Sequence, residues 1–302
     1  MRFLNFIIVL FLCCFSSSFA QTPVADFLKP SDTLNTKRRN AVVISEVALA
    51  STALVGLNEI WFADFDRSKF HTINDNNEWL QIDKLGHMFT AYQVGKQGAH
   101  LLNWSGVTKK DQLIYGATLG FGFLTAVEVL DGYSAEWGYS WGDVGANALG
   151  TGLYISQELL WNEQRIDVKF SFHQTKYASQ RPDKLGKSFF QQVLKDYNGQ
   201  TYWLSFNLHS FFKNSKIPKW LNVAVGYGAD GMLTGVEVTD NQVLTTNQRL
   251  RQYYLSFDVN LTKIRTNSLF LKSIFNVFNM IKIPFPTLEI NKKGTAFHLF
   301  YN

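Results

Sequence analysis

The sequence predicts an α+β protein, with an N-terminal four-helix bundle followed by an antiparallel β domain that is either barrel-like or a sandwich. Long apolar segments without helix breakers fill the first half of the chain. After Glu163 the pattern changes to alternating apolar and polar residues, which is typical of half-buried antiparallel strands. A length of 302 residues is sufficient for two domains. The expected units are a signal peptide, a linker, a helical domain with a polar site and an antiparallel β domain, at 1–20, 21–36, 37–161 and 162–302.

The composition favours a protein of the cell envelope. Aromatic residues make up 15% of the chain and charged residues 18%, whereas about a quarter of an average soluble domain is charged. The formal net charge of +5 is mild, and no Lys/Arg block is long enough to bind nucleic acid. We therefore expect contact with a membrane surface or an envelope lipid, and no nucleic-acid partner.

The first residues, "MRFLNFIIVLFLCCFSSSFAQ", have the pattern of a secretory signal peptide. Ser18 and Ala20 occupy the two small positions before a cleavage site, so we expect cleavage after Ala20. Lipid attachment to Cys13 or Cys14 is the alternative, although Leu12 stands where a lipoprotein signal needs a small residue. A chain cleaved after Ala20 has no cysteine, and hence neither disulfides nor thiolate chemistry.

Four helical segments are expected after the linker, whose turn-forming residues disfavour regular structure. Their connections are short, so neighbouring helices should pack antiparallel. The segments are 38–63, 83–103, 111–131 and 142–161. Small residues in the third and fourth segments should let the helices approach closely: Gly116, Gly120, Gly145, Ala146, Gly150 and Gly152.

Two observations bear on whether these helices cross a membrane. Polar residues such as Glu46, Lys96 and Asn147 interrupt segments that are otherwise long enough to span a bilayer. With four crossings from an exported N-terminus, the loop 64–78 would lie inside, where basic residues are expected, yet it is net acidic. We therefore expect a buried bundle against a membrane surface; four inner-membrane spans are the alternative.

The second half contains several predicted strands. Alternation is clear in "VKFSFHQ", "TYWLSFNLH", "LNVAVGYGADG" and "YYLSFDVNL", and a turn at Asp230–Gly231 should lead into a strand "MLTGVEV". The sheet could form a soluble sandwich or barrel, or a small outer-membrane barrel with its apolar face outward. We expect the aromatic-rich segment 268–283 to be a helix packed on the sheet, with a place at a membrane surface as the alternative.

Polar residues recur at helical spacing inside the apolar segments. Asp83 and His87 are four apart and share one helix face, as do Asp143 and Asn147, while Glu128 lies near the end of the third segment. Burying such groups singly costs several kcal/mol. We therefore expect one cluster where the second, third and fourth helices converge.

Two further residues belong to this predicted site. Asp131 is followed by Gly132, which suits a helix end, and Ser140 precedes Asp143, which suits a helix start. We include Asp131 and Ser140 as secondary site residues. The Trp- and Tyr-rich loop between the two helices is expected to cap the site; a place at a lipid interface is the alternative.

A single imidazole among carboxylates can place a general base beside an acid, or hold a divalent metal ion. The HExxH motif of zinc proteases and the GxSxG elbow of serine hydrolases are both absent from the sequence. A buried polar network that only fixes the register of the helices is an alternative, and so is ligand binding. The identity of any metal stays open at this point.

The stretches "DKLGHMFTAYQVG" and "EVLDGYSAEWGYSWGDVGANALG" resemble the uncharacterised family of predicted periplasmic lipoproteins (domain of unknown function 2279). The order of their polar residues is also similar to that of the VanZ-like family, which is linked to glycopeptide-antibiotic tolerance. The resemblance covers about residues 40–161 and implies a four-helix envelope protein with no established reaction. The matching residues are Asp83, Lys84, His87, Glu128, Ser140, Asp143, Asn147 and Gly150.

We thus expect a protein exported to the periplasm or outer membrane, associated with a membrane and serving envelope maintenance. The alternative is a hydrolase or transferase that acts on an envelope lipid or glycan. In that case His87 would be the base, and the carboxylates would orient it or bind a metal ion.

Overall fold

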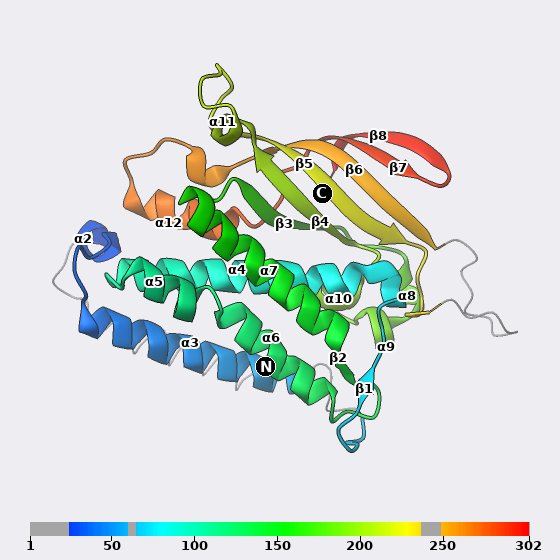
Figure 1. The fold of residues 1–302 in the computed structure, drawn as a ribbon. Helices are drawn as coiled ribbons and strands as arrows, with labels where there is room; N and C mark the ends of the chain where they lie inside the picture. The colour runs from blue at the N-terminus through cyan, green and yellow to red at the C-terminus, as the bar shows by residue number, and fades with distance from the viewer. Residues whose placement is uncertain (1–23, 60–64, 237–248, 302) are drawn as a thin grey trace, which may run out of the picture.

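The computed structural model describes residues 24–59, 65–236 and 249–301. The predicted signal peptide lies outside these residues. In Figure 1 a layer of helices lies against one side of an antiparallel sheet, with α4 between the sheet and α3. The expected α+β class is confirmed.

All four predicted helical segments are helical where the structure describes them. The third is divided by a π-helical turn, and Val24–Leu28, within the predicted linker, forms a short helix of its own. Ser140 caps the fourth helix through its Oγ, which accepts the backbone N–H of Asp143. The helices are α2 (Val24–Leu28), α3 (Thr36–Leu57), α4 (Ile82–Trp104), α5 (Lys109–Asp111), η3 (Gln112–Gly116), α6 (Leu119–Asp131) and α7 (Trp141–Trp161).

Helices α4, α6 and α7 pack closely because small residues lie at their crossings. A Cβ added at Gly150 would lie 2.1 Å from the carbonyl oxygen of Met88, and one at Gly120 would lie 2.4 Å from that of Ala91. Such approaches exclude every residue with a side chain. Gly145 and Gly152 face open space and do not serve this purpose.

Helix α3 is peripheral. Among the described residues of α3, Val42 is the buried one, so the expected four-helix bundle is not established. Both α3 and the segment Lys109–Asp131 are long and apolar enough to cross a membrane by length and composition alone. The second segment is partly buried against α4 and carries Glu128.

The sheet has six antiparallel strands in sequence order: β3 (Ile166–Phe172), β4 (Gln200–Asn207), β5 (Leu221–Asp230), β6 (Leu250–Val259), β7 (Phe285–Asn291) and β8 (Gly294–Tyr301). On its outer edge β3 also pairs with the chain at Ile281. The two-residue strands β1 (Thr72–Ile73) and β2 (Tyr139–Ser140) pair in the loops at one end of the helices.

The two faces of the sheet differ in polarity. One row of cross-strand neighbours is apolar, and its members range from partly covered to well exposed: Leu204, Val225, Leu255, Leu288 and Phe297. The next row is polar apart from Ala224 and largely buried: Ser205, Ala224, Ser256, Thr287 and His298. The polar row is thus the more buried of the two, whereas Val225, Leu255 and Phe297 of the apolar row are exposed.

Two predictions for this half are wrong. Residues 232–236 of the expected strand "MLTGVEV" are not in a strand, because Gly231 has a φ of 80° and the Met232 N–H donates to Asn198 Oδ1 instead of a ladder partner; the rest of that segment lies outside the described residues. Helix α12 (Leu269–Phe278) has no buried residue along its described length and contacts α2 and η4 (Leu261–Lys263) instead of packing in the core.

Short helices complete the described chain. They are η2 (Glu78–Gln81), α8 (Tyr177–Gln180), α9 (Pro182–Leu185), α10 (Phe189–Lys195) and α11 (Leu208–Phe211).

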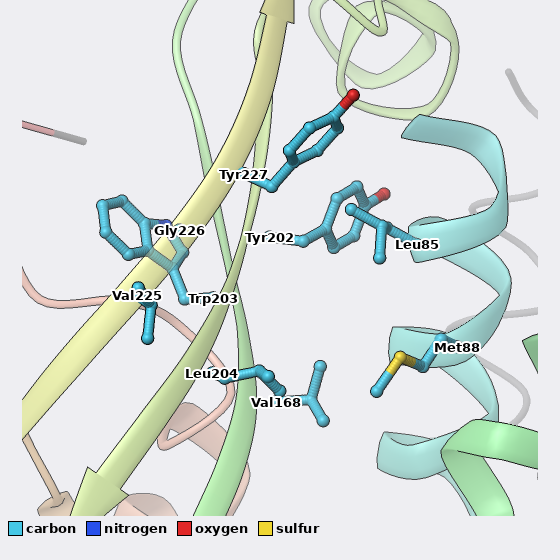
Figure 2. Close-up of a pocket in the computed structure, with 9 residues that line it drawn as sticks. All are labelled: Leu85, Met88, Val168, Tyr202, Trp203, Leu204, Val225, Gly226 and Tyr227. Carbon is cyan, nitrogen blue, oxygen red and sulfur yellow. The ribbon is translucent and has the colours of Figure 1, made fainter. Parts of the chain in front are cut away.

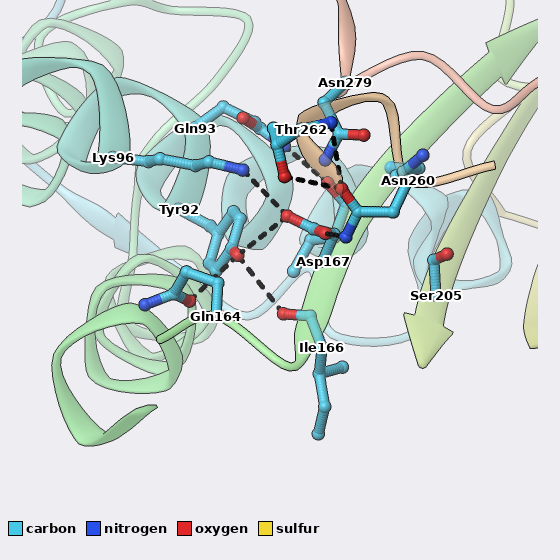
Figure 3. Close-up of polar contacts among 12 residues, drawn as sticks. Tyr92, Gln93, Lys96, Gln164, Ile166, Asp167, Ser205, Asn260, Thr262 and Asn279 are labelled. Atoms are coloured by element: carbon cyan, nitrogen blue, oxygen red, sulfur yellow. Dashed lines mark hydrogen bonds and ion pairs between the residues drawn. The ribbon is translucent and has the colours of Figure 1, made fainter. Parts of the chain in front are cut away.

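The helices and the sheet are joined by a buried polar network, which Figure 3 shows. Lys96 Nζ on α4 lies 2.7 Å from Asp167 Oδ1 on β3, and Asn260 Nδ2 donates to the other carboxylate oxygen at 3.1 Å. Gln93, one turn before Lys96 on α4, donates to the Val168 carbonyl. Because both members of the ion pair are almost fully buried, this contact fixes how α4 lies on the sheet.

Candidate functional site

The predicted polar residues meet at one end of the helical layer. Asp83 and His87 lie in the first turns of α4, Asp143 and Asn147 in the first turns of α7, and Glu128 near the end of α6. Helices α4 and α7 begin at the same end because α6 runs antiparallel between them. The short connections therefore bring residues 60 positions apart, such as His87 and Asn147, into contact.

His87 lies at the centre of the site. Its Nδ1 is 3.1 Å from Asn147 Oδ1, and because an amide oxygen can only accept, Nδ1 carries the proton of this bond. Its Nε2 faces two carboxylates, at 3.6 Å from Glu128 Oε1 and 3.7 Å from Asp143 Oδ1. The side chain keeps 16% of its surface exposed, so water can reach it.

Lys84, which follows Asp83 in α4, holds the acidic groups together. Its Nζ lies 2.7 Å from Asp75 Oδ2, 2.8 Å from Asp143 Oδ2 and 3.2 Å from Asp83 Oδ2. Tyr197, which precedes β4, donates its hydroxyl to Asp83 Oδ1 at 2.7 Å. One ammonium group thus serves three carboxylates.

The loops carrying β1 and β2 lie at this end of the helices. The capping role of the Trp- and Tyr-rich loop stays a prediction, since Tyr133 and Trp141 in it are 47% and 70% exposed. Ser140 Oγ donates to Asp75 Oδ1 at 2.6 Å, and the Ser140 N–H donates to Glu128 Oε2 at 3.1 Å. Ser140 therefore connects the loop to two acidic groups of the site in addition to capping α7. Asp131 is close enough for electrostatic repulsion by Asp83, Asp143 and Asp75.

The excess of acidic groups shifts their protonation. Burial, reinforced by neighbouring carboxylates, raises the pKa of Glu128 to about 8 and that of Asp131 to about 8. The same causes raise the pKa of Asp143 to about 6. For His87, burial favours the neutral form, but the carboxylates, Asp83 foremost, outweigh it and raise the pKa of the imidazole.

The sequence predicted that the site residues on α4, α6 and α7 lie together, but it did not predict two further residues of the site. Asp75 lies in the polar loop before α4, and Tyr197 belongs to the second half of the chain. No periodic signal marks either position, because both reach the site through long-range packing. The remaining described histidines are not among the residues of this site: His71, His100, His173, His209 and His298.

The start of α4 is positioned by the sheet. Trp79, Leu80 and Gln81 adopt left-handed φ angles of 46°, 50° and 66°, each unfavourable for an L-residue by about 1–2 kcal/mol. The turn is held by Tyr227 of β5, whose hydroxyl donates to the Leu80 carbonyl at 2.6 Å, and by Arg251 of β6, which donates to Gln81 Oε1 at 2.6 Å. Strand residues thereby fix the direction in which α4 enters the site.

An apolar groove lies on the neighbouring face of the same helix. It has a volume of about 180 Å³, and Figure 2 shows Leu85 and Met88 of α4 facing Tyr202 and Tyr227 of the sheet across it. Val168, Leu204 and Val225 complete its apolar lining. The groove and the polar site therefore share α4 but use different sides of it.

Comparison with known proteins gives one match. No curated protein and no solved structure matches the chain. Residues 66–157, which are 92 of the 302 residues, match the model of a family described as predicted periplasmic lipoprotein (DUF2279). Neither the VanZ-like resemblance nor an outer-membrane location is shown by this match. The segment that contains every predicted site residue is thus similar to a family of predicted periplasmic lipoproteins, which supports export to the cell envelope.

Proposed function

We propose that this chain is a membrane-associated envelope protein that serves envelope maintenance from the surface of a lipid bilayer. The observation that carries this proposal is the exposed apolar surface of α3. Five large aliphatic side chains on this helix are between 46% and 68% exposed: Val43, Ile44, Val47, Leu49 and Val55. An apolar surface of this extent is typical of a membrane or protein interface.

Two other surfaces support a lipid partner. The outward face of the sheet exposes Leu255, Phe257 and Phe297, and α12 exposes Phe270 and Phe278. A helix with aromatic and aliphatic residues on its exposed face suits the boundary between head groups and acyl chains. The basic start of α3, with Lys37 exposed, adds attraction to anionic lipids.

Vesicle flotation tests this proposal. The mature chain should float with vesicles of phosphatidylethanolamine and phosphatidylglycerol, and the double substitution Ile44→Glu/Val47→Glu should abolish flotation because it places two charges on the apolar surface of α3. Ser179→Glu/Gln180→Glu adds the same charge at exposed positions elsewhere and should float like the wild type. Equal flotation of both variants would contradict a role for α3.

The N-terminus determines how the protein is anchored. Intact-mass measurement of protein isolated from the envelope should show a chain that begins at Gln21. A mass that corresponds to a diacylglycerol on Cys13 or Cys14 would show instead that a covalent lipid anchors the protein to the membrane.

A second candidate function is catalysis, and the geometry of His87 favours it. Asn147 fixes the imidazole with Nδ1 protonated, so Nε2 is available to accept a proton from a hydroxyl or water. Glu128 and Asp143 lie beside it as acids whose pKa is raised toward neutrality. The adjoining apolar groove favours an envelope lipid over a glycan as the substrate of such a hydrolase or transferase.

Mass spectrometry of extracted envelope lipids tests the second candidate. Incubation with the wild-type protein should yield a cleaved or transferred product, and His87→Gln should yield none. His298→Gln, which alters a histidine outside the site that is also paired with a glutamate, should retain the activity. A product formed equally by His87→Gln would exclude His87 as the base.

A further inference from the structure

The distances around His87 Nε2 differ from those of a hydrogen-bonded network. Hydrogen bonds between nitrogen and oxygen measure about 2.7–3.2 Å, whereas Nε2 lies 3.6 Å from Glu128 Oε1 and 3.7 Å from Asp143 Oδ1. Ligand atoms of Asp83, His87 and Asp143 all lie within 4.8 Å of one another. Metal–ligand bonds of about 2.0–2.2 Å place two ligands about 3–4.4 Å apart, depending on the angle between them. The two separations of 3.6 and 3.7 Å therefore suit atoms arranged around a single ion.

A second observation points to a ligand at the same place. Asp143 Oδ1 is buried and has no hydrogen-bond partner among the described residues, and the Asp143 side chain is 4% exposed. Leaving such an atom unpartnered costs about 1–3 kcal/mol, and more for a charged group. Its other oxygen accepts a hydrogen bond from Lys84 Nζ at 2.8 Å. Asp143 is thus oriented by Lys84 so that its free oxygen faces His87.

The charges and the tautomer agree with a cation. Five acidic residues surround two bases, Lys84 and His87, in this part of the described structure: Asp75, Asp83, Glu128, Asp131 and Asp143. The bond from His87 Nδ1 to Asn147 directs the lone pair of Nε2 toward the carboxylates, as outer partners of metal-bound histidines do. A divalent ion would add positive charge where acidic side chains outnumber basic ones.

We propose that this site binds one divalent transition-metal ion, of the class of Zn²⁺ or Mn²⁺, through His87 Nε2 and Asp143 Oδ1, with Asp83 and Glu128 completing the ligand set. The imidazole favours these ions over Ca²⁺ and Mg²⁺, which prefer oxygen ligands alone. Asn147 acts as a positioning residue that orients His87. Metal binding at this site does not depend on membrane association. The metal analysis and the vesicle flotation of α3 variants therefore test separate proposals.

Metal analysis of the full mature chain tests the proposal. The protein is purified with its affinity tag removed, treated with a chelator, dialysed against ZnCl₂ or MnCl₂ and analysed for bound metal, with circular dichroism as a check on folding. The wild type should hold one ion per chain. His87→Gln and Asp143→Asn should lose it, and Asn147→Ala should bind it about 10–100-fold more weakly. His298→Gln is the matched control and should bind like the wild type.

Two results would overturn the site. One is a folded wild type that takes up no ion, and the other is equal uptake by the wild type and His87→Gln. If the ligand variants do not fold, the wild type loaded with Mn²⁺ is measured by electron paramagnetic resonance. The spectrum should show coupling of the ion to an imidazole nitrogen. Absence of that coupling would place the ion elsewhere.

Discussion

Helix α4 takes part in two buried ionic networks that differ in how completely their charges are paired. In the middle of the helix, Lys96 meets Asp167, and both carboxylate oxygens of that aspartate have partners. At the start of the helix, acids outnumber bases, and Asp143 Oδ1 has no hydrogen bond from any described residue. The paired network is thus a structural joint between helix and sheet, whereas the incomplete network leaves a carboxylate oxygen that a ligand would stabilise.

The protonation of the two networks differs in the same way. Despite its burial, Asp167 has a lowered pKa, because Lys96 and Lys169 stabilise the carboxylate. Glu128 has its pKa raised to about 8, because burial and Asp143 outweigh the attraction of His87. A buried carboxylate with sufficient partners stays charged, and one with too few retains its proton.

The largest expected effect comes from breaking the paired network. Lys96→Met should lower the free energy of unfolding by about 3–5 kcal/mol, because it leaves Asp167 charged and buried. Denaturant unfolding measures this loss. Lys110→Met removes an exposed lysine of the same helical layer and should cost less than about 0.5 kcal/mol. Equal losses in the two variants would show that the joint contributes little.

A smaller effect of opposite sign is expected inside the sheet, where a lysine is in excess. Lys169 pairs with Asp258 at 2.7 Å, while Lys282, 1% exposed, donates to the Ile283 carbonyl above the ring of Trp203. Burial lowers the pKa of Lys282 to about 8. Lys282→Met should therefore raise the free energy of unfolding by about 1–3 kcal/mol at pH 7.

The pH dependence of that gain has a definite sign. The folded-state pKa of Lys282 lies below its ordinary value of 10.5, so the folded wild type binds fewer protons than the unfolded chain between about pH 8 and 10.5. Its stability should rise relative to Lys282→Met across that window. The advantage of the variant should be complete below pH 8 and disappear near pH 10.5. Denaturant unfolding at pH 7, 9 and 10.5 measures the difference, and a constant advantage would contradict the assignment.

The smallest effect should come from the acid-rich site. Glu128→Gln in the presence of a chelator should change the free energy of unfolding by less than about 1 kcal/mol at pH 7, because the carboxyl is already largely protonated and the amide still accepts the Ser140 N–H. Asp167→Asn is the matched substitution in the paired network and should cost several times more. A similar loss in both would remove the distinction between the two networks.

The helical part of the site could be predicted because its signal is local. Residues four apart lie on one helix face in any context, and short connections leave few ways to arrange three helices, so His87 and Asp143 could be placed together from spacing alone. Asp75 and Tyr197 could not be predicted, since a loop and a segment from the other half reach the site only through tertiary packing. The pairing of Lys96 with Asp167 is hidden for the same reason.

The sheet shows a similar limit. Period-two alternation revealed β3 to β6, but the hairpin of β7 and β8 was missed, although Thr287 to Asn291 in β7 alternates between polar and apolar residues. The aromatic-rich segment 268–283 was correctly predicted to contain a helix, but the neighbours of that helix were not. Apolar periodicity shows that a face needs covering without identifying whether protein or lipid covers it.

The left-handed turn before α4 has a consequence for the order of folding. Its geometry is unfavourable alone and depends on Tyr227 and Arg251, which follow Asn147 by 80 and 104 positions in the chain. During synthesis from the N-terminus, every helical residue of the site emerges well before the strands that orient α4. The helices can therefore form early while the acidic cluster takes its final arrangement late, and a chain truncated after α7 would keep the residues of the site without their alignment.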